Sequence, residues 1–194
     1  EKLTIDCPTF LQSSKNPIYF IAEIGGNHEG NFNRAQRQLD LAIEAGVDAV
    51  KFQIYRGDRL VSPVENESRN NRFRDFELTK DEFEKLATKA NEHDIDFLAS
   101  VWDKKSLEWV NPMVPFHKIG SGDLTAFPLI RQMAETGKPI LLSTGLSTLE
   151  EVRRTVDFIK KIDSSYITEN KLVLLQCNSM YPTPDRDAHI RAMH

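Results

Sequence analysis

The chain has 194 residues and a formal net charge of −4; 40% of its residues are hydrophobic and 28% are charged. This length suffices for one domain with a sizeable core, and the composition is ordinary for a soluble globular protein. The negative charge argues against a nucleic-acid surface, which would need a basic stripe. No apolar run is long enough to suggest a membrane span.

The first residues and the two cysteines bear on the cellular compartment in which the protein is expected to reside. Residues Glu1–Phe10 lack a basic head followed by an apolar stretch, so no signal peptide is visible. Cys7 and Cys177 lie far apart, which is typical of thiols in a reducing compartment rather than of a disulfide framework. We therefore expect a cytoplasmic protein.

Short apolar runs alternate with amphipathic segments along the chain. Continuous runs rich in Ile, Val, Leu and Phe are typical of strands buried on both faces of a parallel sheet. The opening segment, up to Pro17, is expected to form a short hairpin. The predicted strands are, in chain order, Tyr19–Ile24, Ala49–Gln53, Phe97–Val101, His117–Gly120, Ile140–Ser143 and Leu172–Gln176.

Helices are predicted between these strands. Apolar residues at helical spacing run through Ala35–Ile43, and Gly46 then ends the first helix. A capping box over Thr79–Glu82 predicts the start of another helix. The charged segment Gly57–Phe76 has no periodicity, and we expect a long loop there.

Two further helices are predicted in the second half of the chain. An apolar stripe begins at Leu129 and ends before Gly137. A capping box over Ser147–Glu150 predicts the start of the helix that carries Val152.

The alternation of strand and helix predicts an α/β fold built from right-handed parallel units. An open doubly wound sheet and a (β/α)8 TIM barrel both fit this pattern. About six units are visible, whereas a barrel needs eight in roughly 250 residues. A barrel would therefore be incomplete in this chain.

Polar residues recur at the carboxyl end of every predicted strand, where a parallel α/β barrel carries its chemistry. Lys51 and Lys118 lie inside apolar strands, and two inward lysines would repel each other unless an anion joined them. Ser121 stands between two glycines, which let backbone N–H groups approach a phosphate. Glu23 is either an ion-pair partner of a lysine or a functional carboxylate. The strand-end candidates are Glu23, Lys51, Gln53, Ser100, Lys118, Ser121, Asp123, Ser143, Ser179 and Tyr181.

Five segments in a fixed order carry a family resemblance: Ile21–Gly30, Gly46–Gln53, Lys118–Asp123, Leu142–Gly145 and Leu175–Pro184. With them the chain resembles the N-acetylneuraminate (sialic acid) synthases and their legionaminate and pseudaminate relatives. The resemblance implies that residues 1–194 form a synthase-type TIM-barrel domain. It implies condensation of phosphoenolpyruvate with N-acetylmannosamine or a related N-acyl aldose, giving a nine-carbon 2-keto acid sugar and phosphate.

The resemblance also implies roles for individual residues. Asp123 would be the acid/base carboxylate near the sugar aldehyde, although many bacterial relatives carry Glu there. Glu23 would support the lysines, and Ser143 would contact substrate. Gln53 and Tyr181 would face the sugar. The phosphate and carboxylate of phosphoenolpyruvate would be held by Lys51, Ser100, Lys118, Ser121 and Ser179.

The resemblance further implies a divalent metal, Mn²⁺ or Mg²⁺, whose two histidine ligands would follow His194. It implies a homodimer through a C-terminal antifreeze-like domain that this chain does not contain. Two alternatives stay open: a related 3-deoxy-2-keto acid synthase acting on a phosphorylated aldose, and a non-catalytic sugar-binding barrel.

Overall fold

The computed structural model describes residues 8–12 and 18–193. The chain divides into two compact units, Glu1–Pro115 and Phe116–His194. The predicted opening hairpin falls mostly outside the described residues, which show there a 3₁₀ turn, η1 (Thr9–Leu11). Among the helices described, none combines the length and the apolar character needed to cross a membrane.

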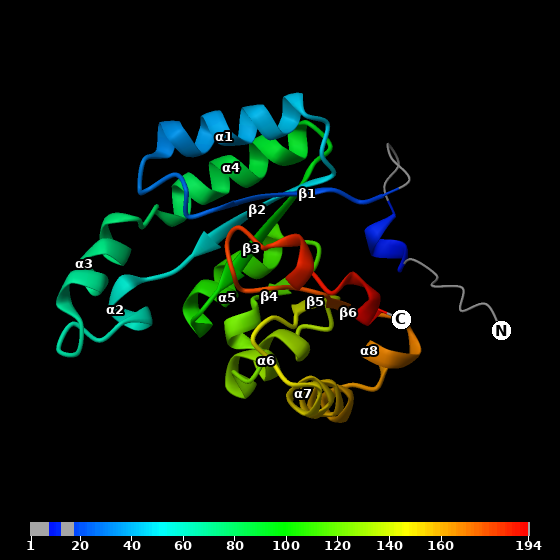
Figure 1. Cartoon of the computed structure of the whole chain (residues 1–194). Helices are drawn as coiled ribbons and strands as arrows, with labels where there is room; N and C mark the ends of the chain where they lie inside the picture. The colour runs from blue at the N-terminus through cyan, green and yellow to red at the C-terminus, as the bar shows by residue number, and fades with distance from the viewer. Residues whose placement is uncertain (1–7, 13–17, 194) are drawn as a thin grey trace. The chain divides into compact units, whose positions relative to one another are not determined.

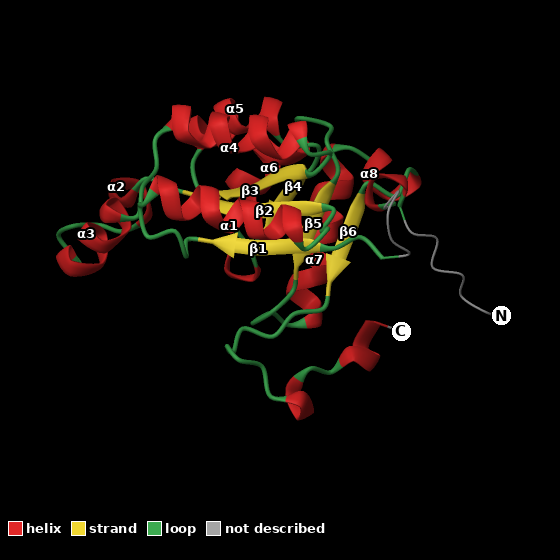
Figure 2. Cartoon of the chain, turned by 90° about the horizontal axis from the view of Figure 1, so that it is seen from above, coloured by secondary structure: helices red, strands yellow, loops and turns green. Residues whose placement is uncertain are grey.

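The first unit is built on a parallel sheet in the order β1-β2-β3 (Ile21–Gly25, Ala49–Ile54 and Asp96–Val101). Helices α1 (Phe32–Glu44) and α4 (Lys80–Glu92) pack against each other beside this sheet (Figures 1 and 2). The ring of Phe52 stacks on Phe97 at 5.6 Å and meets Phe83 edge-on at 6.1 Å. These aromatic contacts bury the sheet under α4. Helix α5 (Lys104–Val110) follows β3 and leads into the 3₁₀ turn η2 (Asn111–Met113).

The prediction of a loop over Gly57–Phe76 is wrong. The segment forms two helices, α2 (Gly57–Leu60) and α3 (Glu67–Asp75). Helix α3 is polar on nearly all sides, so it shows no apolar period in the sequence. Its one buried residue, Asn70, donates to the carbonyl of Val61 at 2.8 Å and to Asp58 at 3.3 Å. Side-chain hydrogen bonds therefore hold this helix where an apolar stripe would normally do so.

The second unit is a parallel sheet in the order β4-β5-β6 (His117–Ile119, Ile140–Ser143 and Leu172–Leu175). Helices α6 (Phe127–Ala134) and α7 (Leu149–Ile162) pack together, and α8 (Ser165–Thr168) follows α7. Three 3₁₀ turns complete the unit: η3 (Ser121–Asp123), η4 (Asp185–Asp187) and η5 (Ile190–Met193).

Two details of the second unit correct the sequence expectations. Strand β6 lies at the edge of its sheet and is not buried on both faces, because Leu174 is 45% exposed. Helix α7 starts from a capping box of Thr148 and Glu151, not of Ser147 and Glu150. Both pairs fit the motif, so the sequence could not separate them. The box over Thr79–Glu82 is confirmed, and positive φ angles at Gly46 and Gly137 fit their predicted positions just past helix ends.

Candidate functional site

Lys51 in β2 is the centre of a polar cluster in the first unit. The residue is 5% exposed, and its Nζ lies 2.9 Å from Glu23 Oε2 and donates to Ser100 Oγ at 3.2 Å. Glu23 is the partner of Lys51 in the β1–β2 ladder, which brings the two side chains together. The ion pair predicted for Glu23 is therefore confirmed, and so is the inward position of Lys51.

The carboxylate of this cluster differs from its ammonium in exposure. The Glu23 side chain is 56% exposed, whereas that of Lys51 is 6% exposed. Water therefore reaches the Glu23 carboxylate, while the buried Lys51 ammonium is stabilised by its contacts with Glu23 and Ser100. An anion reaching Lys51 would meet a cation whose own solvation is already weak, which strengthens a charge-assisted contact.

Lys118 in β4 forms a comparable contact in the second unit. Its Nζ donates to Ser143 Oγ, at the end of β5, at 2.7 Å and to the carbonyl of Ile119 at 3.1 Å. The β4–β5 ladder pairs Lys118 with Leu141, so its side chain reaches along the sheet toward the carboxyl end of β5. Lys118 is half-buried. A lysine beside a strand-end serine thus occurs in each unit.

A backbone cradle follows β5. The N–H of Gly145 donates to Ser121 Oγ at 3.0 Å. A Cβ added at Gly145 would lie 2.7 Å from Ser179 Oγ and 2.9 Å from Ser121 Oγ. Two hydroxyls and a backbone N–H therefore crowd around a glycine that has room for no side chain. Such a group of small donors suits a phosphate or carboxylate.

Asp123 ends the turn η3 that follows β4. Its backbone N–H donates to the carbonyl of Gly120 at 3.0 Å, and its side chain is half-buried. The carboxylate lies against the backbone, since Oδ2 would be 3.3 Å from a Cβ added at Gly120. The turn therefore needs a small residue at position 120. The acid/base role of Asp123 stays a prediction.

Gln53 and Tyr181, the two residues expected to face the sugar, have different surroundings. The Gln53 side chain lies beside the loop after β1, with its Oε1 3.4 Å from the position of a Cβ at Gly26. Tyr181 follows β6 and is 91% exposed. The sugar-facing roles of both residues stay predictions.

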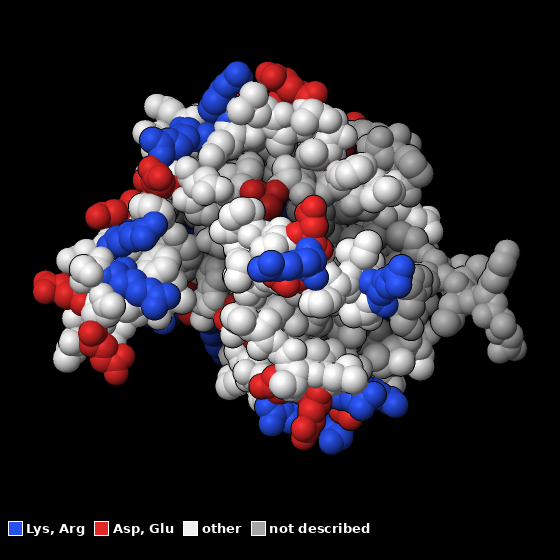
Figure 3. Space-filling model, viewed as in Figure 1, with Lys and Arg blue, Asp and Glu red and all other residues white. Residues whose placement is uncertain are grey.

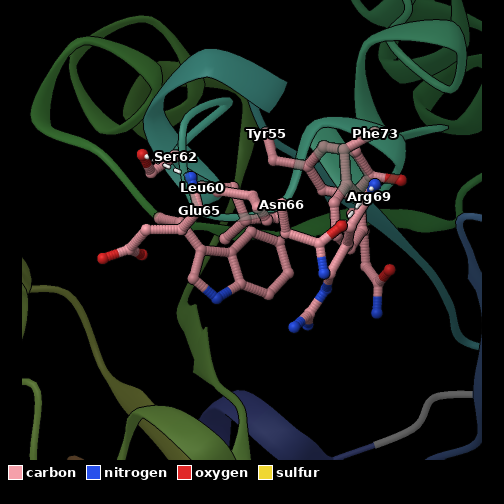
Figure 4. A pocket seen from close by; sticks show the side chains of 10 residues that line it. Tyr55, Leu60, Ser62, Glu65, Asn66, Arg69 and Phe73 are labelled. Atoms are coloured by element: carbon pink, nitrogen blue, oxygen red, sulfur yellow. Dashed lines mark hydrogen bonds between the residues drawn. The ribbon is translucent and has the colours of Figure 1, made fainter. Parts of the chain in front are cut away.

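The structure reveals a pocket that the sequence analysis missed. It has a volume of about 480 Å³ and lies in the first unit, between the ends of β2 and β3 and the segment with α2 and α3 (Figure 4). Its lining comprises Gln53, Tyr55, Leu60, Val61, Ser62, Glu65, Asn66, Arg69, Phe73 and Trp102. Trp102, directly after β3, was a visible signal. The lining residues from α2 and α3 were not recognised, because this segment was expected to be a loop.

The aromatic side chains of this pocket form one wall. The Tyr55 ring meets Phe73 edge-on at 5.0 Å and Trp102 at 5.7 Å. The Arg69 guanidinium lies 5.6 Å from the centre of the Phe73 ring, at cation–π distance. On the face seen in Figure 3, acidic and basic side chains are interspersed over α2 and α3.

The described residues do not test the expected metal, because the two histidine ligands that the resemblance implies would follow His194. Across residues 8–12 and 18–193, no group of three or more His, Cys, Asp or Glu side chains could hold an ion. His28 is buried between the rings of Phe52 and Phe83, and its Nδ1 accepts the N–H of Gly30 at 3.2 Å. It ties down the loop after β1. Burial lowers the pKa of His28.

The fold and these clusters define a class: an α/β protein with parallel sheets whose strand ends present lysines, hydroxyls and backbone N–H groups. Residues 38–194 match the family model described as the NeuB family, and the chain belongs to that family. It is 30% identical over 199 residues to an N-acetylneuraminate-9-phosphate synthase of Mus musculus, covering 96% of this chain and 54% of the relative.

A bacterial relative and a solved structure agree with this. The chain is 31% identical to an N,N'-diacetyllegionaminic acid synthase of Legionella pneumophila, covering 94% of this chain and 54% of that protein. The crystal structure of an N-acetylneuraminic acid synthetase from Leptospira borgpetersenii, in complex with citrate, matches with a TM-score of 0.82 and 32% identity. The match covers 91% of this chain and 60% of that one. The chain thus spans about half the length of the curated relatives it matches.

Proposed function

We propose that the protein condenses phosphoenolpyruvate with N-acetylmannosamine or a related N-acyl aldose. The products would be a nine-carbon 2-keto acid sugar and inorganic phosphate. The observation that carries this proposal is the Lys51 cluster, a buried ammonium beside a serine hydroxyl at a strand end in a member of the NeuB family. Glu23 offsets part of the cost of burying this cation, and an anionic substrate beside it would offset more.

Each unit by itself carries groups suited to an anion. In the first unit these groups are Lys51 and Ser100; in the second they are Lys118 with Ser143, and the cradle of Ser121, Ser179 and the Gly145 N–H. Phosphoenolpyruvate carries a phosphate and a carboxylate, and charge-assisted contacts to both would orient it.

The proposed reaction forms one carbon–carbon bond. Carbon 3 of phosphoenolpyruvate attacks the aldehyde carbon of the sugar, whose oxygen takes a proton and becomes a hydroxyl. Carbon 2 becomes electron-poor, water adds to it with loss of a proton, and phosphate leaves from the resulting adduct. Asp123 would exchange the proton at the aldehyde oxygen, and Glu23 would hold Lys51 in position. Gln53 and Tyr181 would contact the sugar.

Several coarser features belong to the same proposal. We propose that the parallel strand–helix units belong to a (β/α)8 barrel and that the protein is a cytoplasmic homodimer. Its partners would be small molecules rather than nucleic acid or membrane. Dependence on Mn²⁺ or Mg²⁺ stays a prediction, tested by chelation of the full-length protein, and no step is assigned to the ion.

The experiment that tests the proposal follows phosphate release. Full-length protein would be mixed with phosphoenolpyruvate and N-acetylmannosamine, and inorganic phosphate and the 2-keto acid product would be measured. The expected result is phosphate release that depends on the sugar. Sugar-independent release would contradict the proposed condensation. No release with any N-acyl aldose would also contradict it, and would favour a non-catalytic sugar-binding protein.

A further inference from the structure

The outer face of helix α7 carries a stripe of charged residues to which the proposed reaction assigns no role. The buried residues of this helix are Thr155 and Ile159, and the stripe lies on the opposite side. On the face seen in Figure 3, acidic and basic side chains lie side by side at the bottom, where Figure 1 labels α7. The stripe follows helical spacings of three and four residues and consists of Glu150, Arg153, Arg154, Asp157, Phe158 and Lys161.

A groove runs along this stripe, beside α6. It has a volume of about 570 Å³ and is lined by Phe127 of α6 together with residues of the stripe. The rings of Phe127 and Phe158 lie with their centres 4.8 Å apart. The Arg154 guanidinium lies 5.3 Å from the centre of the Phe127 ring, and that of Arg131 lies 5.2 Å from the Phe158 ring. The groove thus combines two aromatic rings with guanidinium groups at cation–π distance.

The charges of the stripe are not neutralised by ion pairs within the described part of the chain. No ion pair found there includes Glu150, Arg153, Arg154, Asp157 or Lys161. The stripe carries both signs, so a peptide of one sign would meet like charges along it. The partner that fits must carry both signs in a matching order.

The order of these charges is complementary to its own reverse. A twofold axis through the middle of α7, between residues 155 and 156, would place a second copy of the helix antiparallel to the first. Residues equally far from the axis then face each other. Glu150 would face Lys161 of the partner subunit, and Arg154 would face Asp157 of the partner subunit. Each pair would occur twice, and in each pair the charges are opposite.

The spacing and the aromatic floor of the groove fit the same arrangement. The four paired positions follow one another at intervals of four, three and four residues, which is the seam along which two helices pack at a small crossing angle. Arg153, beside this seam, would face Phe158 of the partner subunit. Arg131 already lies over that ring within one chain, so the ring is open to a guanidinium.

We infer that α7 forms a twofold contact with α7 of a second copy of this chain, held by the pairs Glu150–Lys161 and Arg154–Asp157. Helix α7 has 14 residues and is about 21 Å long, so the contact is smaller than a permanent dimer interface. Association should therefore depend on protein concentration and weaken at high salt, which screens exposed ion pairs. The inference does not depend on the proposed reaction, since no group assigned to that reaction lies in α7.

Sedimentation velocity of the full-length protein between about 1 µM and about 1 mM tests the inference, because weak contacts become populated over this range. The expected result is an association step that doubles the mass of the species present at low concentration. If the proposed homodimer forms through another surface, the step converts a dimer into a tetramer; otherwise it converts a monomer into a dimer. A mass that stays constant over the whole range would overturn the inference.

Charge reversal identifies the contact. Arg154→Glu would bring carboxylates together across the axis, and Asp157→Arg would bring guanidinium groups together. Each should raise the dissociation constant of the step about tenfold or more, because the change acts twice in each contact. An equimolar mixture of the two variants restores opposite charges, as does the double variant, and both should associate within about threefold of wild type. Single variants that associate like wild type, or a mixture that fails to associate, would overturn the inference.

A matched pair of substitutions in α5 controls for net charge. Lys104 and Glu108 form an exposed ion pair there, and Lys104→Glu and Glu108→Lys change the net charge by the same amounts as the α7 variants. Both should leave the association step unchanged. All four substituted side chains are exposed, so circular dichroism should show every variant folded. An equal loss of association in the α5 variants would assign the effect to net charge and overturn the inference.

Discussion

The unequal exposure of Lys51 and Glu23 makes the two halves of their ion pair respond differently to mutation. In Glu23→Gln the ammonium stays 94% buried, with Nζ near Ser100 Oγ but no opposite charge. Breaking a fully buried pair in this way costs about 3–5 kcal/mol, and leaving a buried polar group short of a partner costs about 1–3 kcal/mol. Because Glu23 is 56% exposed, we expect a loss of about 2 kcal/mol in the free energy of unfolding.

The reverse change leaves no buried charge. In Lys51→Met the side chain keeps its length and stays apolar among its neighbours, while Glu23 is solvated by water. A pair with one exposed member contributes about 0–1 kcal/mol, so this variant should lose less than about 1 kcal/mol. In the double variant, Glu23→Gln adds little further loss of stability, because the Lys51 ammonium that it would leave without an opposite charge is already absent. We therefore expect a coupling energy of about 1–2 kcal/mol between the two substitutions.

The assay is urea unfolding of full-length protein, followed by circular dichroism at neutral pH, with free energies compared at equal m-values. The exposed pair Lys80–Glu84 is the matched control. Lys80→Met and Glu84→Gln should each change stability by less than about 0.5 kcal/mol, with no difference between them. A Lys51→Met variant as unstable as Glu23→Gln would refute the argument from exposure.

Four further predictions concern the second unit. Lys118→Ala should weaken phosphoenolpyruvate binding in calorimetry by about 10-fold or more while circular dichroism stays unchanged, because one charge-assisted contact is worth about 1.5–3 kcal/mol; equal affinity would contradict its role. Asp123→Asn should lower kcat about 10²–10⁴-fold with little change in KM, and a decrease of less than about threefold would exclude proton transfer. Gly145→Ala should abolish phosphoenolpyruvate binding and destabilise the fold by about 1–3 kcal/mol, because its Cβ would lie 2.7 Å from a serine hydroxyl; normal affinity would contradict the cradle. Burial, with a smaller contribution from Lys138, lowers the pKa of His117 from 6.5 to about 4, so the unfolded state binds more protons between these values. The corresponding stability is complete above about pH 6.5 and falls by about 2 kcal/mol on acidification to about pH 5, whereas a His117→Asn variant should show a shallower slope; equal slopes would contradict this.

Local signals in the sequence were reliable where one short-range contact decides the structure. The box over Thr79–Glu82 starts α4 as predicted, because the contacts that form it lie within four residues. The second box was predicted one residue early, since Ser147 and Thr148 offer the same chemistry. In the structure the Ser147 hydroxyl donates to the Gly145 carbonyl instead, and Thr148 caps the helix.

Helix α3 escaped prediction for a different reason. Its sequence has no apolar period. The helix is held in place by hydrogen bonds from the buried amide of Asn70 to Asp58 in α2 and to Val61 directly after it. A hydrogen bond between neighbouring helices leaves no periodic trace in a sequence. The pocket lined by α3 was therefore missed as well.

The sequence by itself determined the α/β class, most strand positions and the chemical types gathered at the strand ends. It could do so because parallel buried strands require continuous apolar runs, in which lysine and serine stand out. Only the tertiary structure decided which of these groups meet. The pairing of Lys51 with Glu23, the contact of Lys118 with Ser143 and the serine cradle at Gly145 each depend on strand register or on a close approach of loops. Such contacts join residues 24 to 34 positions apart, and no local pattern encodes them.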